Sequence, residues 1–586
     1  MSEPVPKPDA KPAADKGPAL RASAALLLAR AIQSLHPGAK LGTSTTTSEE
    51  FSYDVLTARP LAEEDLPAIE AKMRELIKAN LSLKRDFIPR EEAIAYFQAR
   101  GEDLKAELLQ ERAEEKAEVV RLGDDWLDLV EPGPQAFRTG DLKHFKLTRQ
   151  GGAYWKGDAT RPQLSRVTGT IWPTKDALEQ HLARVEEAKK RDHRKLGKEM
   201  DLFMFHPYSP GAPFWLPKGL VVWNLLSQRM REYLVDNGYQ EIRTPILYEK
   251  SLFETSGHWQ NYRENMFIIK EDEQTLLAMK PMNCPSHMLV YASKTRSYRD
   301  LPIRFHDQSI LHRNEVRGTL GGLTRLRQFS QDDAHLFVRP DQIEEEITKL
   351  LAMVHRVNTL FGFEYRAKLS TRPEKFMGEI ELWNEAERQL ENALKANSIP
   401  YQVNPGDGAF YGPKIDFDLT DALGRKWQCA TIQLDFQNPL RFDLRYVAEG
   451  GEEKHPVVIH RAIYGSLERF FAILLEHYAG NLPVWLAPVQ AKVLSLSAPY
   501  AEYARQVGAQ LKALGLRVEV DDSDQTLPAK VRIAELEKVP YMLVVGGKEA
   551  ESGTVSVRSR VDKKEEGTFT VTEIGERLRK LSDVRY

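Results

Sequence analysis

The sequence predicts a multidomain α+β protein. Its 586 residues exceed what one hydrophobic core normally organises, since a domain holds roughly 150 residues. A Pro/Gly-rich stretch, HPYSPGAPFWLPKG, marks a domain boundary near residues 206–219. Beyond residue 481, β-rich runs such as YMLVVGG alternate with helical ones, which is typical of an α/β domain.

The composition excludes several classes of protein. Hydrophobic residues make up 42% and charged residues 28%, and no apolar run approaches the ~18 residues of a membrane span. The first residues lack the apolar core of a signal peptide, so we expect a cytoplasmic protein without a membrane partner. Two cysteines, Cys284 and Cys429, are too few for a disulfide framework, so any special role is metal binding or chemistry. A net charge of −3 excludes a uniformly basic nucleic-acid surface but allows local basic patches.

The N-terminal region opens with a predicted disordered tail. Residues 1–18 are mostly Pro, Ala, Lys and Asp, with almost no large apolar side chain to offset the entropy of ordering. Residues 19–36 then show a helical pattern that Pro37 and Gly38 end, and a second amphipathic helix is predicted at about 64–79.

A single charged helix is predicted at about 175–198. Glu186 with Lys190 and Glu187 with Arg191 form i,i+4 pairs of favourable polarity, which indicates a solvated helix face. The last ten residues are mostly cationic, so a linker helix facing an RNA backbone is the alternative, and both interpretations stay open.

The segment LHRNEVRGTLGGLTRLRQFSQDDAHLF is the richest in functional side chains. Arg313 precedes its Gly-rich turn and Arg325 follows it, and arginine is the residue that binds phosphates bidentately. Period-two spacing would place six side chains on one face of a strand: Arg325, Arg327, Phe329, Gln331, Asp333 and His335. A solvent-exposed edge would also explain so polar a face, but the aromatic and the histidine favour a site.

This segment resembles motif 2 of class II aminoacyl-tRNA synthetases in its threonyl-tRNA synthetase form. PMNCPSHM, LSTRPEK, GAFYGPKIDF and TIQLDF resemble further signature blocks, while TPILYE and HRAIYGSLERF resemble motifs 1 and 3. The blocks occur in the family's order over nearly the whole chain. The resemblance implies a class II antiparallel β-sheet core flanked by helices at 201–481, an α+β editing-like domain with a linker helix at 19–200, and an α/β anticodon-binding domain at 482–586.

The resemblance also implies the reaction: threonine and ATP, with Mg²⁺, form threonyl adenylate, which is transferred to tRNA(Thr) by a homodimer built through motif 1. Arg313 would bind the α-phosphate, Glu315 the adenine amino group, and Arg325 with Arg469 the γ-phosphate. Phe329 would stack under adenine against Arg469. Lys414 would counter the charge that develops on the α-phosphate and carboxylate.

Three further residues match the family's zinc ligands: Cys284, His335 and His460. Without the resemblance, a buried cysteine and two core histidines would be the default interpretation. Three N/S ligands leave zinc an open position for substrate. The resemblance implies that zinc takes the amino and hydroxyl groups of threonine, that Asp333 accepts from the hydroxyl, and that Gln331 and Tyr411 line the pocket. Valine, without a hydroxyl, would be rejected strongly.

Serine lacks only a methyl group, worth roughly 1–3 kcal/mol, so relatives carry an editing domain with an HSxxH helix and a later Cys and His. Here Ala22 and Leu26 occupy the helix positions, and Val130 and Gln135 the later ones. We therefore expect loss of editing chemistry. The ubiquitin-like domain with which relatives often begin is also not expected.

Several residues that differ from those usual in the family, and two residues of the C-terminal domain, allow more than one interpretation. Ser286, HDQSI, Ala430 and Tyr464 replace residues usual in the family, either by neutral drift or in an inhibitor-resistant isoform. Glu549 and Arg558 match positions that contact anticodon bases, although solvated surface charges would explain either alone. The rival function is a synthetase-like RNA-binding or regulatory protein that does not charge tRNA, which the retained motif arginines disfavour.

Overall fold

The computed structural model describes residues 16–129, 138–158, 160–272, 275–560, 565–584 and 586. The chain divides into two compact units, Met1–Glu186 and Glu187–Tyr586. Within the described parts of the chain, every helix is too short or too polar to cross a bilayer.

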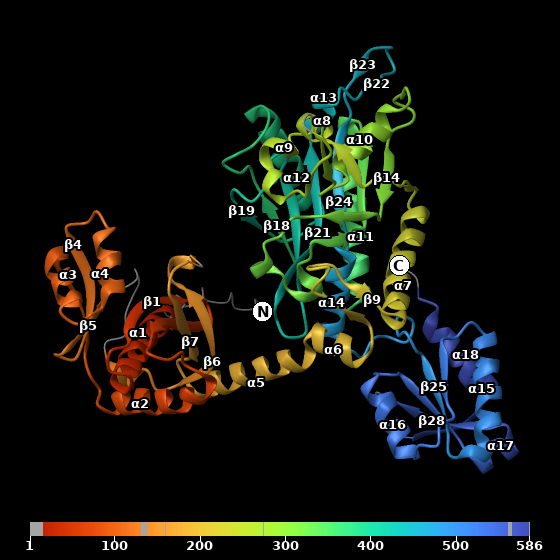
Figure 1. The fold of residues 1–586 in the computed structure, drawn as a ribbon. Helices are drawn as coiled ribbons and strands as arrows, with labels where there is room; N and C mark the ends of the chain where they lie inside the picture. Colours follow the sequence, from red (N-terminus) through yellow and green to blue (C-terminus); the bar gives the residue numbers. More distant parts are fainter. Residues whose placement is uncertain (1–15, 130–137, 159, 273–274, 561–564, 585) are drawn as a thin grey trace, which may run out of the picture. The chain divides into compact units, whose positions relative to one another are not determined.

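The first unit is built on a four-stranded antiparallel sheet with helices against it (Figure 1). Its strands follow the spatial order β1 (Lys40–Thr46), β2 (Glu50–Leu56), β7 (Gln163–Ile171) and β6 (Phe145–Tyr154). Helices α1 (Gly17–Leu35) and α2 (Leu66–Lys78) contact this sheet. The predicted tail of residues 1–18 extends too far, because α1 already begins at Gly17. Pro18 is favourable there, since the first turn of a helix has no use for its missing N–H. Residues 1–15 lie outside the described part of the chain.

A smaller α+β layer completes this unit. The strands β3 (Leu83–Pro89), β4 (Lys116–Leu122) and β5 (Trp126–Leu129) form an antiparallel sheet. Helices α3 (Arg90–Gln98) and α4 (Asp103–Gln110) pack against it around a small apolar core. The described part of the first unit therefore has one core around α1, a second around this layer and a small third cluster of Leu104, Trp155 and Leu164.

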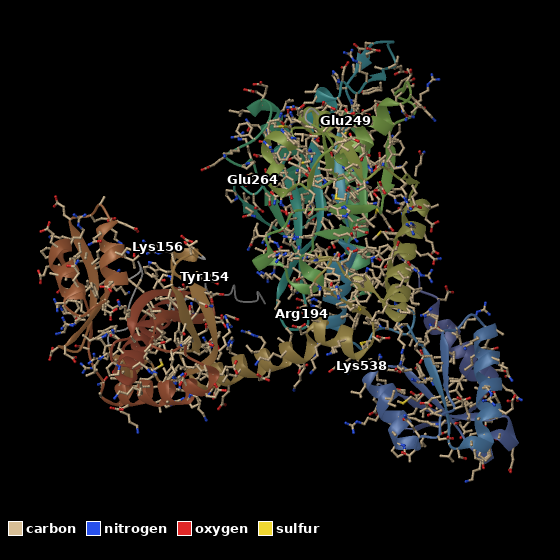
Figure 2. All side chains as sticks on the ribbon, viewed as in Figure 1. Tyr154, Lys156, Arg194, Glu249, Glu264 and Lys538 are labelled. Atoms are coloured by element: carbon tan, nitrogen blue, oxygen red, sulfur yellow. The ribbon has the colours of Figure 1, made fainter. Side chains whose placement is uncertain are left out.

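The predicted helix at 175–198 is wrong in one respect, because the structure forms two helices. These are α5 (Lys175–Arg191) and α6 (His193–Glu199), separated at Asp192, which has φ −50° and ψ 121°. The Asp192 side chain accepts a hydrogen bond from the backbone N–H of Arg194 at 2.8 Å and so caps α6. Figure 2 labels Arg194 on this helix. The predicted ion pair between Glu187 and Arg191 forms at 2.8 Å.

The second unit is organised by an eight-stranded sheet, which confirms the predicted class II antiparallel core. Its order is β10 (Gln240–Glu241), β14 (Ile303–Asp307), β17 (Asp333–Val338), β24 (Val457–Ala462), β21 (Lys426–Asp435), β20 (Lys414–Thr420), β18 (Glu364–Ser370) and β19 (Tyr401–Asn404). Only the two edge pairs, β10 with β14 and β18 with β19, run parallel among the pairs of this sheet.

Helices cover both faces of this sheet. On one face, α11 (Ile343–Leu360) and α12 (Ile380–Ala396) bury alternate strand residues such as Leu336 and Ile459. On the other, α10 (Cys284–Ala292) packs against Phe337 and Val458. Helices α7 (Pro217–Asp236) and α14 (Leu467–His477) join the larger core. Because strand side chains alternate, His335 and His460 point to the α10 face.

Small sheets and short helices surround this core. They include β11 (Leu247–Glu249), β12 (Ile268–Lys270) and β13 (Leu276–Met279), the pair β15 (Ile310–His312) and β16 (Gln328–Ser330), β8 (Phe203–Met204) with β9 (Phe214–Trp215), β22 (Tyr446–Val447) with β23 (Glu453–Lys454), and α8 (Lys250–Thr255), α9 (His258–Asn261) and α13 (Gln437–Arg441).

The single strand predicted over residues 325–335 is divided between two sheets. β16 pairs with β15, whereas β17 belongs to the large sheet. The break falls beside Asp332, which is fully buried and accepts hydrogen bonds from the backbone N–H groups of Ile463 (2.9 Å) and Gly465 (3.0 Å). These bonds draw the chain towards the end of β24, a long-range contact that periodicity cannot reveal.

The C-terminal part confirms the predicted α/β domain. Its five strands lie in the order β26 (Val518–Asp521), β25 (Ala491–Ser495), β27 (Tyr541–Val545), β28 (Thr554–Ser559) and β29 (Glu565–Thr570). The first three are parallel and the last two antiparallel. Its helices are α15 (Ala501–Ala513), α16 (Leu527–Leu536), α17 (Gly547–Ser552) and α18 (Val571–Ser582).

Candidate active site

A cavity of about 500 Å³ opens beside the large sheet of the second unit. It gathers side chains from motifs that are far apart in the sequence. Predicted site residues among its lining are Cys284, Arg313, Glu315, Arg325, Phe329, Gln331, Asp333, Tyr411, Lys414, His460 and Arg469. His335 is fully buried next to Cys284 and His460. The structure thus brings nearly all predicted site residues together.

Two arginines of the segment that resembles motif 2 flank one side of the cavity. The guanidinium of Arg313 lies 5.0 Å from the centre of the Phe329 ring, and its Nε donates to the carbonyl of Pro281. Arg325 forms an ion pair with Glu315 at 2.9 Å. Phe329 is therefore faced by Arg313 in this structure, and the stacking of adenine between Phe329 and Arg469 stays a prediction.

Arg469 and Lys414 approach the cavity from other elements. Arg469 lies in the first turn of α14, where Ser466 caps the helix by accepting from its backbone N–H at 3.2 Å. Its guanidinium donates to the carbonyl of Gln428 at 3.2 Å. Lys414 begins β20, and its ammonium pairs with Asp416 at 2.7 Å. Cations held by such contacts around one cavity suit a polyanionic ligand.

The two histidines are brought together by strand pairing. His335 on β17 lies directly opposite His460 on β24 in the antiparallel register. Cys284 is the first residue of α10, on the same face of the sheet. One ligand atom from each of the three lies within 4.8 Å of the others, and all three residues are buried. Sheet register, which local spacing cannot show, therefore creates this cluster.

One nitrogen of each histidine has a partner and the other does not. His335 Nδ1 lies 2.8 Å from His287 Nδ1, and His460 Nε2 lies 2.8 Å from an Asp435 carboxylate oxygen. His335 Nε2 and His460 Nδ1 are buried and have no hydrogen-bond partner among the described residues. A buried polar atom left in this way can bind water or a ligand, and metal-bound histidines are normally oriented through their second nitrogen. The Cys/His/His donor set fits zinc.

The protonation of the cluster favours a cation at the same place. Burial lowers the pKa of His335 well below its usual value, which keeps the neutral imidazole that binds metals. Burial also lowers the pKa of His460, but the charges of Cys284 and Asp435 outweigh it and raise that pKa to about 10. The charge that these groups stabilise can be supplied by a proton or by a metal ion.

Polar side chains beside the cluster could orient a small ligand. Asp333 accepts a hydrogen bond from the Asn283 amide at 3.0 Å. The Tyr411 hydroxyl lies 3.9 Å from the Cys284 sulfur. Gln331 is half-buried and forms a backbone bridge with Ser466. The second carboxylate oxygen of Asp333 thus remains for a ligand hydroxyl.

Sequence analysis missed the residues that support this cluster. His287 lies three residues after Cys284 on α10, a helical spacing that could have flagged it. Asp435 lies two residues after Gln433 on β21, and Gln433 pairs with His460 in the register. Period-two spacing places Gln433 and Asp435 on the same face of β21. The sequence does not reveal, however, that β24 is the strand that pairs with β21.

The other predicted residues lie elsewhere. In the C-terminal domain, Glu549 accepts from the backbone N–H of Gly546 at 2.9 Å and Arg558 lies on β28. In the first unit, Ala22 is half-buried and Leu26 buried on α1. Val130 and Gln135 lie outside the described residues.

The first unit contains its own buried polar cluster. Lys105 forms an ion pair with Asp128 at 2.6 Å, and both are almost fully buried. The Tyr53 hydroxyl donates to Asp128. Glu102 accepts from the backbone N–H of Leu41 at 2.6 Å, and burial raises its pKa to about 7.

Comparisons with known proteins agree with this geometry. Residues 267–478 match the family model described as tRNA synthetase class II core domain (G, H, P, S and T), and residues 484–581 match the anticodon binding domain model. The chain is 51% identical over 534 residues to a threonine–tRNA ligase of Symbiobacterium thermophilum, covering 91% of this chain and 82% of the relative. It is 49% identical over 537 residues to one of Caldanaerobacter subterraneus subsp. tengcongensis, covering 92% and 83%.

A solved structure is also similar. The RNA binding domain of threonyl-tRNA synthetase from Cryptosporidium parvum Iowa II is 44% identical, with a TM-score of 0.64. The match covers 67% of this chain and 98% of that one.

Proposed function

The chain belongs to the threonine–tRNA ligases, which are aminoacyl-tRNA synthetases, and on this premise we propose how its residues carry the reaction. Its substrates are threonine, ATP with Mg²⁺, and tRNA. Threonine carboxylate attacks the α-phosphorus of ATP, and pyrophosphate leaves. A hydroxyl of the terminal adenosine of the tRNA then attacks the threonyl carbonyl and releases AMP.

The cavity cations neutralise charge during adenylate formation. Arg313 takes the α-phosphate, Arg325 and Arg469 the γ-phosphate, and Lys414 the charge that grows between α-phosphate and carboxylate. No side chain becomes a covalent nucleophile, because in-line displacement at phosphorus needs mainly positioning and charge neutralisation. The convergence of these four cations on one cavity supports the assignment.

Adenine binds between Phe329 and the guanidinium of Arg469, with Glu315 accepting from its amino group. Arg325 pairs with Glu315 at 2.9 Å, so ATP binding redistributes this contact: the guanidinium turns to the phosphate and the carboxylate to the base. Phe329 lines the cavity, and its aromatic ring offers a flat apolar surface for the base.

Cys284, His335 and His460 would hold the zinc ion through which threonine is recognised. The observation that carries this proposal is the pair of buried, unpartnered nitrogens, His335 Nε2 and His460 Nδ1. Bound zinc would supply an open coordination position for the amino and hydroxyl groups of threonine. Asp333 accepts a hydrogen bond from the hydroxyl, Gln331 lies near the amine, and Tyr411 lines the pocket. Valine leaves Asp333 unpaired, which a buried carboxylate tolerates poorly.

A second copy of the chain completes the enzyme as a homodimer. The motif 1 region carries exposed apolar side chains on and next to the small β11–β13–β12 sheet: Ile246, Leu247, Ile268 and Ile269. Neighbouring apolar residues that remain exposed in one copy are typical of an interface.

The first unit lacks the usual means of hydrolysing seryl-tRNA(Thr). Ala22 and Leu26 offer no ionisable group on α1, so neither can act as a general acid or base. We extend the proposal to Val130 and Gln135 on the sequence pattern alone.

Anticodon bases are read by the C-terminal domain, with Glu549 and Arg558 as contacts. The departures at Ser286, Ala430 and Tyr464 are buried and do not line the cavity. Their placement favours neutral drift over a pocket remodelled against an inhibitor.

Threonine-dependent ATP–pyrophosphate exchange in the presence of zinc tests the assignment. We expect exchange with the unmodified protein and a loss of about 10²–10³-fold in Arg313→Ala, since its contact matters most as charge builds. Zinc content should be unchanged in that variant. No exchange by the unmodified protein would instead favour the non-charging RNA-binding or regulatory alternative.

A further inference from the structure

A buried histidine lies against the turn that carries Arg325. His193 begins α6 and is only 4% exposed. Its ring meets the short helical turn Gly322–Thr324, which directly precedes Arg325. Leu323 in this turn is 1% exposed, so the contact is closed to solvent.

Both ring nitrogens of His193 have partners, and these define its tautomer. Nε2 accepts a hydrogen bond from the backbone N–H of Leu323 at 3.0 Å. Because Nε2 accepts, the proton lies on Nδ1, which donates to the Glu476 carboxylate at 2.6 Å. The same carboxylate oxygen accepts the backbone N–H of His193 at 3.1 Å. The imidazole is thus a neutral bridge between Glu476 and Leu323.

Gly322 permits this close approach. Its φ of +59° is a left-handed conformation that other residues adopt with strain. A Cβ atom at this position would also lie 2.2 Å from His193 Nε2. Turn conformation and imidazole position therefore depend on each other.

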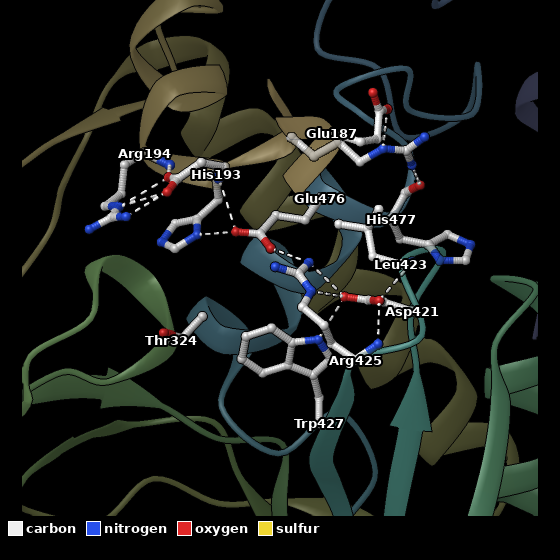
Figure 3. A network of polar contacts seen from close by, with 12 residues as sticks. Glu187, His193, Arg194, Thr324, Asp421, Leu423, Arg425, Trp427, Glu476 and His477 are labelled. Carbon is white, nitrogen blue, oxygen red and sulfur yellow. Dashed lines mark hydrogen bonds and ion pairs between the residues drawn. The ribbon is translucent and has the colours of Figure 1, made fainter. Parts of the chain in front are cut away.

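Glu476 connects the histidine to the helix of the other phosphate-binding arginine. Its second oxygen accepts from Arg425 at 2.5 Å, and Arg425 in turn pairs with Asp421 at 2.6 Å (Figure 3). Glu476 lies near the C-terminal end of α14, and Arg469 lies in the first turn of this helix. The His193–Glu476 pair therefore joins the Arg325 turn to the Arg469 helix.

We propose that His193 is a positioning residue for ATP: its Nε2 holds the Gly322–Thr324 turn so that Arg325 and Arg469 face the γ-phosphate together. The inference rests on the proposed roles of these two arginines. His193 touches neither substrate nor reacting atom and acts through the Leu323 N–H. Its removal should weaken ATP binding and leave threonine binding nearly unchanged.

The same residues could be taken for a second cation site, since Asp192, His193 and Glu476 lie close together. Both nitrogens of His193 are already hydrogen-bonded, however, and Asp192 accepts from the Arg194 backbone at 2.8 Å. These satisfied contacts favour positioning.

Two conservative variants separate the two contacts of His193. The amide oxygen of His193→Gln reaches the place of Nε2 and can still accept from Leu323. The shorter amide of His193→Asn reaches only the place of Nδ1 and keeps the Glu476 contact. We expect His193→Asn to raise the KM for ATP about tenfold in the exchange assay, in line with one lost buried hydrogen bond. His193→Gln should restore a near-normal KM.

Matched measurements exclude a merely structural role. The KM for threonine and the zinc content should stay within about twofold of normal in both variants, and Lys195→Ala, an exposed position on the same helix, should change none of the values. Equal KM values for ATP in the Asn and Gln variants would overturn the proposal. So would a parallel rise of both KM values.

Two further variants keep the outcome decisive. If His193→Asn does not fold, Gly322→Ala takes its place, because its Cβ displaces the imidazole, and an unchanged KM for ATP there overturns the inference. Arg325→Ala tests the premise separately. If Arg325→Ala leaves the KM for ATP unchanged, the proposed function fails; if it raises that KM and His193→Asn does not, only the positioning role fails.

Discussion

The two units each bury a cluster of polar side chains, and the clusters differ in what they leave unsatisfied. In the second unit, His335 Nε2 and His460 Nδ1 are buried without a hydrogen-bond partner among the described residues, in the cluster that includes Cys284. In the first unit, Lys105 and Asp128 are equally buried but pair with each other at 2.6 Å.

This difference separates a site from a structural network. Burial of a polar group costs free energy unless a partner compensates it, so a cluster that satisfies itself has no need of a ligand. The cluster of the second unit lacks the partner that its donor atoms require. A buried polar atom without a partner is therefore a stronger indication of chemistry than membership of a recognisable domain.

The largest expected effect follows from removing a donor in the second unit. Cys284→Ser or His335→Ala should abolish zinc binding and lower threonine-dependent exchange by at least about 10³-fold, since zinc recognition of threonine needs all three donors. Metal analysis and the exchange assay measure the two effects. Far-ultraviolet circular dichroism should show a folded chain.

Cys429→Ser is the matched control, because Cys429 is also buried and lines the same cavity. Burial raises the pKa of the Cys429 thiol to about 12, so it stays protonated and is a poor metal ligand at neutral pH. Full zinc in Cys284→Ser, or zinc loss in Cys429→Ser, would contradict the ligand assignment.

The next effect is on stability. Lys105→Met leaves the buried Asp128 carboxylate without its counter-ion, so the free energy of unfolding of the first unit should fall by about 3–5 kcal/mol. Threonine-dependent exchange should be unchanged. Urea denaturation followed by circular dichroism measures the loss. Lys116→Met, at the exposed first residue of β4, should change the free energy of unfolding by less than about 0.5 kcal/mol. A loss of exchange activity in Lys105→Met would contradict the claim that the cluster of the first unit has only a structural role.

The fold of the catalytic core was predicted through a family resemblance, whereas the α/β fold of the C-terminal domain was predicted from its alternating β-rich and helical runs. Period-two spacing correctly placed Phe329, Gln331 and Asp333 beside one cavity. It could not place the break at Asp332, since that residue bonds to backbone groups near Gly465. Long-range hydrogen bonds of this kind leave no local pattern.

The supporting residues escaped prediction for a related reason. Asp435 can support His460 only because β21 pairs with β24 and brings the two side chains together. The proposed role of His193 likewise depends on the contact between α6 and the turn at Leu323. The proposed zinc ligands were predicted through a family resemblance, and neither spacing nor burial could have selected them from the sequence.

A smaller effect concerns pH. Burial raises the pKa of Glu102 to about 7 from an ordinary 4.5. Between these values the folded state keeps a proton that the unfolded state has lost, so stability falls as pH rises and levels off above the folded pKa. The loss is about 1.4 kcal/mol for each pKa unit.

Unfolding of the first unit should therefore become easier from pH 5 to pH 7, and Glu102→Gln should flatten this slope. Denaturation at a series of pH values measures it. Glu114→Gln, at an exposed position, should keep the slope of the unmodified protein. A slope of opposite sign would show that Glu102 is ionised in the folded state.

The last prediction is the absence of an activity, the deacylation of seryl-tRNA(Thr), and it tests whether the polar cluster of the first unit is only structural. If its polar cluster is only structural, the protein should deacylate preformed seryl-tRNA(Thr) no faster than the uncatalysed background. Ala22 and Leu26 cannot move protons, and Lys105 and Asp128 are engaged with each other. Serine should meanwhile be activated at a disadvantage of roughly 1–3 kcal/mol, one methyl group, so seryl-tRNA(Thr) should accumulate when threonine is left out. Rapid deacylation that Lys105→Met abolishes would assign the chemistry to the buried pair, and a satisfied cluster would then no longer mark a structural role.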